Sequence, residues 1–96
     1  MVICISLYLQ NANKDYTLFF NALKGLGEVF NEIPNFYVVR LLGRYANSNV
    51  DTIAQLLSRY VDSSTDRLIL YEVTGRRPNG LLSQEAWNWL NARISG

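Results

Sequence analysis

The sequence predicts one α+β domain built around a four-stranded antiparallel sheet, with its elements in the split βαβ order. Its 96 residues, 49% apolar and 18% charged, suit a single compact domain. Stretches with strand composition alternate with stretches whose apolar residues repeat at helical spacing. No repeat, low-complexity tract or linker interrupts the pattern, so we expect one domain over residues 1–96.

The first strand and the first helix open the chain. Residues 2–9 form an almost continuous run of apolar, β-branched and aromatic side chains, which is typical of a central strand. A helix is expected over residues 15–26, where four apolar residues recur at helical spacing, namely Phe19, Phe20, Leu23 and Leu26. Gly25 and Gly27 then end the helical pattern.

A hairpin is expected over residues 28–42. The pair Pro34-Asn35 suits the corner of a turn between an arm over 28–32 and an arm over 36–42. The second arm is strongly strand-forming, whereas the first is more polar. We therefore expect the first arm to be the exposed one.

A helix, a strand and a last helix follow. Asn49 can cap a helix over residues 50–61, whose apolar positions keep a period of 3.6. Residues 67–74 return to strand composition. Ser83 can start a last helix ending near Ile94, on which Trp89 points away from the apolar stripe of Trp87, Leu90 and Ile94.

This order corresponds to a ferredoxin-like βαββαβ sandwich with an extra C-terminal helix. Right-handed crossovers place the first two helices on one face of the sheet. The opposite face is then left for the last helix or for a second copy of the chain. A second copy there would make Tyr8 and Trp89 candidate interface residues.

The composition excludes several classes of enzyme. With no histidine and one cysteine, the chain cannot build a Cys/His zinc site, a Ser-His-Asp triad or a Cys-His pair. Cys4 lies in an apolar run and is expected to be a buried thiol in a reducing compartment. Residues 1–9 do not resemble a signal peptide, and no apolar stretch reaches the length of a membrane span. We expect a cytoplasmic protein without a cofactor, a bound metal or a membrane partner.

Several local strings resemble the SinR-like family, which is similar to the small CRISPR-associated adaptation nucleases and to VapD-type ribonucleases. These strings are Lys14-Asp15-Tyr16, residues 22–27, residues 66–75 and Trp87-Asn88-Trp89-Leu90. Together with the order of the elements, the pattern covers nearly the whole chain. The resemblance implies a ferredoxin-like homodimer, with Arg67 and Glu72 as candidate interface residues at its symmetry axis.

One departure from the nuclease relatives concerns their chemistry. The resemblance implies an aspartate just after the first strand for divalent-metal chemistry, but Ser6-Leu7-Tyr8-Leu9-Gln10 carries no acid. Asp15, the nearest acid, also suits the start of a helix. We therefore predict a non-catalytic homodimeric binding protein. The alternative is a metal-dependent nuclease in which Asp15 or Glu72 replaces the missing aspartate.

The partner of such a protein is expected to be a nucleic acid or another protein. Four arginines are candidates for contacts with phosphates, namely Arg40, Arg44, Arg76 and Arg77. The net charge of +1 supplies little long-range attraction, so the same arginines also suit an ordinary solvated surface. A small-molecule site lined by apolar residues is a third possibility.

Overall fold

The computed structural model describes residues 1–76 and 80–94. It contains every element that the sequence predicts, in the same order, with an additional 3₁₀ turn at Gly43–Tyr45. The elements are β1 (Val2–Tyr8), α1 (Thr17–Lys24), β2 (Gly27–Phe30), β3 (Phe36–Leu41), α2 (Val50–Ser58), β4 (Arg67–Glu72) and α3 (Gln84–Ile94). The fold is thus α+β, with three α-helices in the described residues.

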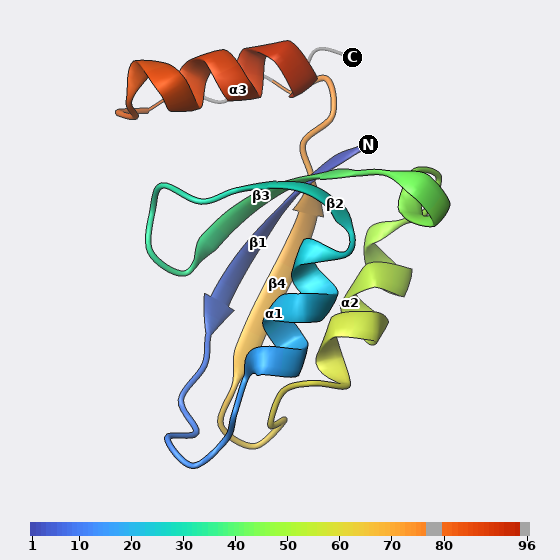
Figure 1. The fold of residues 1–96 in the computed structure, drawn as a ribbon, viewed down its shortest axis with the longest axis vertical. Coiled ribbons are helices and arrows are strands. Elements are labelled where there is room, and N and C mark those ends of the chain that lie inside the picture. Colours follow the sequence, from blue (N-terminus) through green and yellow to red (C-terminus); the bar gives the residue numbers. More distant parts are fainter. Residues whose placement is uncertain (77–79, 95–96) are drawn as a thin grey trace.

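The four strands form one open antiparallel sheet in the order β2-β3-β1-β4. In the middle of β1, Ile5 lies opposite Tyr37 of β3 and Leu70 of β4. Figure 1 shows α1 and α2 side by side along the sheet and α3 beyond one end of these two helices. The predicted four-stranded antiparallel sheet is confirmed.

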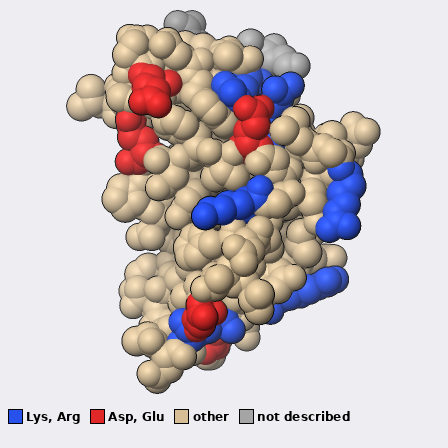
Figure 2. Space-filling view, viewed as in Figure 1, with Lys and Arg blue, Asp and Glu red and all other residues tan. Residues whose placement is uncertain are grey.

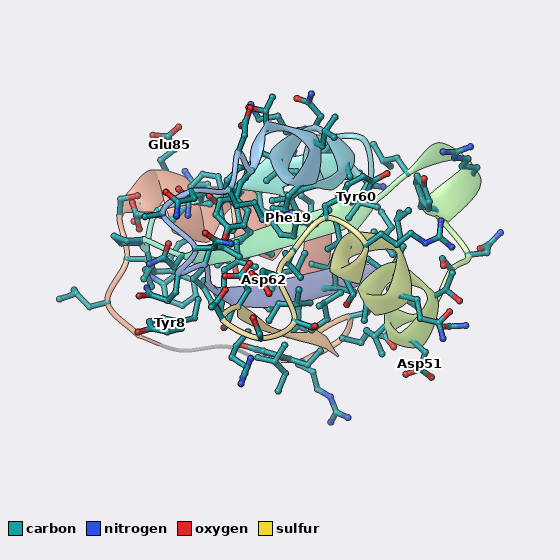
Figure 3. The ribbon with its side chains drawn as sticks, turned by 90° about the horizontal axis from the view of Figure 1, so that it is seen from below. Tyr8, Phe19, Asp51, Tyr60, Asp62 and Glu85 are labelled. Atoms are coloured by element: carbon teal, nitrogen blue, oxygen red, sulfur yellow. The ribbon has the colours of Figure 1, made fainter. Side chains whose placement is uncertain are left out.

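The main core lies between the sheet and the two helices α1 and α2. Alternate residues of β1 point into this core, and they pack with Phe19 and Leu23 of α1 and with Ile53 and Leu57 of α2. Phe19 is fully buried, and Figure 3 shows it in the interior of the molecule. The apolar stripes that the sequence predicts for these two helices are confirmed.

Part of the opposite face of the sheet is covered by α3. Val2, Cys4 and Val38 of the sheet are buried against Leu90 and Ile94 of this helix. The last helix is therefore one cover of the face that the sequence leaves open. It does not extend over the whole face, because Tyr8 at the end of β1 is 56% exposed.

Two contacts attach α3 to the edge strand β2. The ring of Trp89 stacks on Phe30 with 5.3 Å between the ring centroids. The guanidinium of Arg93 bonds the carboxylate of Glu28 at 2.7 Å and also lies over the Trp89 ring. These contacts leave β2 half-buried, so the exposed first arm that the sequence predicts is wrong for residues 28–30 and confirmed for Asn31 and Glu32.

The helix ends test the capping residues and the helix boundaries that the sequence predicts. The side chain of Asn49 accepts from the Thr52 N–H at 2.9 Å, and Ser83 Oγ accepts from the Ala86 N–H at 3.1 Å, so both predicted caps are confirmed. The first helix is shorter than predicted, because the Asp15 carboxylate accepts from the Thr17 N–H at 2.9 Å and the helix begins there. At the C-terminal end of α2, the N–H of Tyr60 bonds the carbonyl three residues earlier, which tightens the chain and ends the α-helix at Ser58.

Candidate functional site

The outer edge of β4 is open for pairing with another strand. β4 lies at one end of the sheet, and its only partner among the described strands is β1. The Val73 N–H donates to the Val2 carbonyl at 2.9 Å, and antiparallel ladders alternate in which residues bond a given neighbour. The backbone groups of Leu68, Leu70 and Glu72 therefore face away from β1, toward solvent.

Exposed apolar side chains lie beside this edge, on the face of the sheet opposite α1 and α2. Tyr8 and Arg67 are register partners there, and Ile69 and Tyr71 share their face because alternate residues of a strand point the same way. Ile69 is 62% exposed and Tyr71 is 43% exposed. Figure 3 shows Tyr8 pointing away from α1, on the opposite side of the molecule. We call these four residues the β1–β4 strip.

The structure brings together two of the four predicted interface residues. Tyr8 and Arg67 belong to the β1–β4 strip. Glu72 is exposed at the other end of β4, where its register partner is Ile3. Trp89 packs within the chain, on Phe30 of β2.

Ile69 and Tyr71 complete the strip, but neither was predicted as an interface residue from the sequence. Both belong to β4, which carries apolar residues on both of its faces. Apolar residues on both faces would have indicated an interface, but only if the strand were known to lie at the edge of its sheet.

The predicted phosphate-binding arginines lie in different surroundings. Arg40 pairs with Glu28 at 3.2 Å. Arg44 lies over the Tyr45 ring in the 3₁₀ turn, and Arg76 is exposed beside Thr74 in the loop after β4. Arg77 lies outside the described residues. The three described arginines therefore lie on different parts of the molecular surface.

Arg44 lines a groove of about 460 Å³. The groove is lined by residues of α1 and α2, of the segment just after α2 and of the 3₁₀ turn. Its lining residues are Asn21, Ala22, Gly25, Gly27, Leu42, Gly43, Arg44, Tyr45, Leu56 and Tyr60. No carboxylate is among them. In Figure 2, basic side chains spread over the helices while acidic ones gather toward the two ends of the molecule.

The acids considered for metal chemistry do not lie together. The Asp15 carboxylate accepts from the hydroxyl and the N–H of Thr17, and these hydrogen bonds lower the pKa of Asp15. Glu72 lies at the end of β4 that pairs with the start of β1, whereas Asp15 follows the end of β1. Within residues 1–76 and 80–94, no three His, Cys, Asp or Glu side chains are close enough to hold a metal ion.

Asp66 is a buried carboxylate, although the sequence predicts it only as part of a turn. It is 4% exposed and accepts from the backbone N–H groups of Gln10 and Asp62, each at 2.8 Å. The hydroxyl of Tyr16 also donates to it. Burial by itself raises the pKa of Asp66, but these donors outweigh it and lower the pKa to about 2. These hydrogen bonds connect the loop after β1, the start of α1 and the turn before β4.

Comparisons with protein-family models, curated proteins and solved structures find no match to this chain. Among the described residues, no helix is both long and apolar enough to cross a membrane.

Proposed function

We propose that this protein is a non-catalytic binding protein that acts as a homodimer, with β4 of one protomer pairing against β4 of its partner. One observation carries the proposal: within residues 1–76 and 80–94, β4 combines an edge that pairs with no second strand with exposed apolar side chains. Such edges bind further strands unless charge, a bulge or a covering segment prevents it. Within β4 the charged residues are only the terminal Arg67 and Glu72.

Symmetry restricts how two β4 strands can pair. A two-fold axis perpendicular to the sheet makes the strands antiparallel and keeps each face continuous, so the paired residues must lie on the same face. With Ile69 at the axis, it meets Ile69 of the partner subunit. Arg67 then faces the partner's Tyr71, a cation–π pair, and Leu68 faces the partner's Leu70. This register pairs apolar residues at positions 68, 69 and 70, places the charged Arg67 over an aromatic ring, and is the one we propose.

The proposal extends to the fold and the family. A ferredoxin-like topology is supported by the strand order β2-β3-β1-β4 and by the position of α1 and α2 against one face of the sheet. Membership of the SinR-like group is supported by the strings at residues 14–16, 22–27, 66–75 and 87–90. The third string contains the whole of β4, and the second contains Gly27 at the start of β2.

Sedimentation velocity of the full chain tests the dimer. We expect the wild type to sediment as a dimer at high micromolar concentration and Ile69→Lys to sediment as a monomer, because the substitution places two ammonium groups against each other at the axis. Leu18→Lys is the matched control, since Leu18 is 66% exposed on α1, outside the strip.

The two variants separate a dimer through β4 from other associations. The control should remain a dimer. A monomeric wild type at these concentrations would disprove the proposal. Equal dissociation by both lysine variants would mean that the interface does not lie at β4.

A further inference from the structure

We infer that the groove between α1 and α2 binds a nucleoside monophosphate unit, either free or within a single-stranded nucleic acid. The inference rests on the proposed binding function and gives it a ligand class, but it does not depend on the dimer. None of the residues that line the groove belongs to β4. The two proposals can therefore fail separately.

The size of the groove suits a ligand of this class. Its volume of about 460 Å³ falls within the range of roughly 300–1,000 Å³ that is usual for small-molecule sites. Two sides come from the helices, through Ala22 of α1 and Leu56 of α2. Both of these side chains also contact the main core, which keeps the walls in place.

Arg44 provides the charge that a phosphate needs. It is exposed, and among the described residues it makes no ion pair, in contrast to Arg40 and Arg93, which share Glu28. Its guanidinium donates once to the Tyr45 hydroxyl, at 2.8 Å, and lies 4.9 Å from the centre of that ring. This contact holds the side chain at the groove, and its remaining donors suit a bidentate contact with a phosphate.

Tyr60 supplies the surface for a base, because the Tyr45 ring is covered by the Arg44 guanidinium. Tyr45 and Tyr60 are both half-buried, and each also packs against the main core. Figure 3 shows Tyr60 between α1 and α2, whereas Asp51 points away on the far side of α2. Bases stack on such rings with little dependence on sequence. An aromatic surface beside an unpaired guanidinium fits a base joined to a phosphate better than it fits either part alone.

The surroundings of the groove favour an anion. Lys24 at the end of α1 and Arg59 just after α2 are both exposed, and each is next in sequence to a lining residue. Basic side chains on the helix side attract phosphate groups over a distance of about 10 Å at ordinary ionic strength. Gly43 leaves open space at the lining, since a Cβ atom there would meet nothing within 4 Å.

The test is a titration of the full chain with four ligands, followed by amide chemical shifts and calorimetry. The ligands are adenosine monophosphate, adenosine, inorganic phosphate and a short single-stranded oligonucleotide. We expect saturable binding of the monophosphate with shifts at the groove, at least roughly tenfold tighter than binding of adenosine or of phosphate alone. Tighter binding of the oligonucleotide would identify a strand as the source of the nucleotide unit, whereas equal affinity would identify the free nucleotide.

Variants assign the two contacts. Arg44→Gln should weaken binding of the monophosphate roughly tenfold and leave adenosine unchanged, because it removes the charged contact with the phosphate. Tyr60→Leu keeps the apolar bulk and should weaken both ligands. Arg76→Gln removes an arginine outside the groove and should change neither.

Three results would overturn the inference. They are the absence of saturable binding, phosphate binding as tightly as the monophosphate, and Arg44→Gln having no more effect than Arg76→Gln. Ile69→Lys distinguishes this inference from the dimer proposal. The variant should bind the monophosphate as tightly as the wild type does, even if its protomers no longer associate.

Discussion

The hydroxyl of Tyr16 lies 2.8 Å from each carboxylate oxygen of Asp66, a residue 50 positions later in the chain. The same carboxylate accepts from the Gln10 N–H, which follows β1, and from the Asp62 N–H, in the turn before β4. One buried anion thus joins the loop after β1, the start of α1 and the approach to β4. This junction sets where the edge strand begins.

The first prediction concerns acid stability. The pKa of Asp66 is about 2 in the folded protein, below its ordinary value of 3.8, so the ionised carboxylate stabilises the fold. This contribution is complete above about pH 4 and is lost as the pH falls through 4 toward 2. In Asp66→Asn we expect a melting temperature lower by roughly 10 °C at pH 7, because an amide cannot accept from all these donors. The difference from the wild type should shrink between pH 4 and pH 2 in thermal scans followed by circular dichroism.

The matched control for this prediction is Asp51→Asn, which changes an exposed acid in the first turn of α2. It should lower the melting temperature much less and should not reproduce the convergence in acid. If Asp66→Asn and the wild type differed by the same amount at pH 7 and at pH 2, the ionised form of Asp66 would not be the stabilising one.

The second prediction fixes the register of the dimer. With Ile69 at the two-fold axis, the two Ile69 residues form a pair without ladder hydrogen bonds, whose Cα atoms lie about 4.5 Å apart. This distance is within the range of a disulfide. In a Cys4→Ala background, Ile69→Cys should therefore give a disulfide-linked dimer on mild oxidation, seen on a non-reducing gel.

Tyr71→Cys in the same background is the control, because Tyr71 faces the partner's Arg67 in this register. Its cross-linking should be slow. Fast cross-linking through position 71 and none through position 69 would show that the strands pair in another register, even if the protein remains a dimer.

Features governed by local chemistry were predicted from the sequence. Asn49 caps α2 because its side chain reaches an N–H three residues later, and the apolar residues of α2 keep their spacing. The turn at Pro34-Asn35 depends in the same way on neighbouring residues, since the Phe36 N–H bonds the Ile33 carbonyl. Element order and sheet type follow from such signals.

Features governed by distant partners were not predicted. From the sequence, Asp66 is predicted to be an ordinary turn residue, because Tyr16 and Gln10 are far from it along the chain. Ile69 is expected to be a core residue as long as β4 is not known to be an edge strand. Arg44 was only one of four candidates for phosphate contacts, and the groove that it shares with Tyr60 depends on how α2 packs against α1.

The third prediction concerns Gly27, at the start of β2. Its φ of 156° is rarely adopted by other residues, and a Cβ atom there would overlap the Arg40 carbonyl oxygen. Gly27→Ala should therefore destabilise the protein by more than about 2 kcal/mol in urea unfolding, because backbone must move. Gly43→Ala is the comparison. Gly43 has a φ of 58° but open space around a Cβ, so only the conformational cost of about 1–2 kcal/mol applies. Equal losses in the two variants would contradict the steric argument.

The fourth prediction uses Cys4 to report on the attachment of α3. Cys4 is buried beneath this helix, and burial raises the pKa of its thiol from 9.0 to about 11, an effect only partly offset by a hydrogen bond with Tyr71. Because the thiolate is the reactive form, labelling by a disulfide reagent at pH 8 should be about a hundredfold slower than for an ordinary thiol from the pKa alone.

Trp89→Ala should speed this labelling roughly tenfold, because it removes the stacking on Phe30 and leaves the ion pair of Arg93 with Glu28 to hold α3. Leu18→Ala, on the exposed side of α1, should leave the rate unchanged. Melting curves of each variant distinguish detachment of α3 from global unfolding. If labelling of Trp89→Ala were as slow as that of the wild type while its melting temperature fell, Trp89 would stabilise the whole domain and not specifically the cover that α3 provides over Cys4.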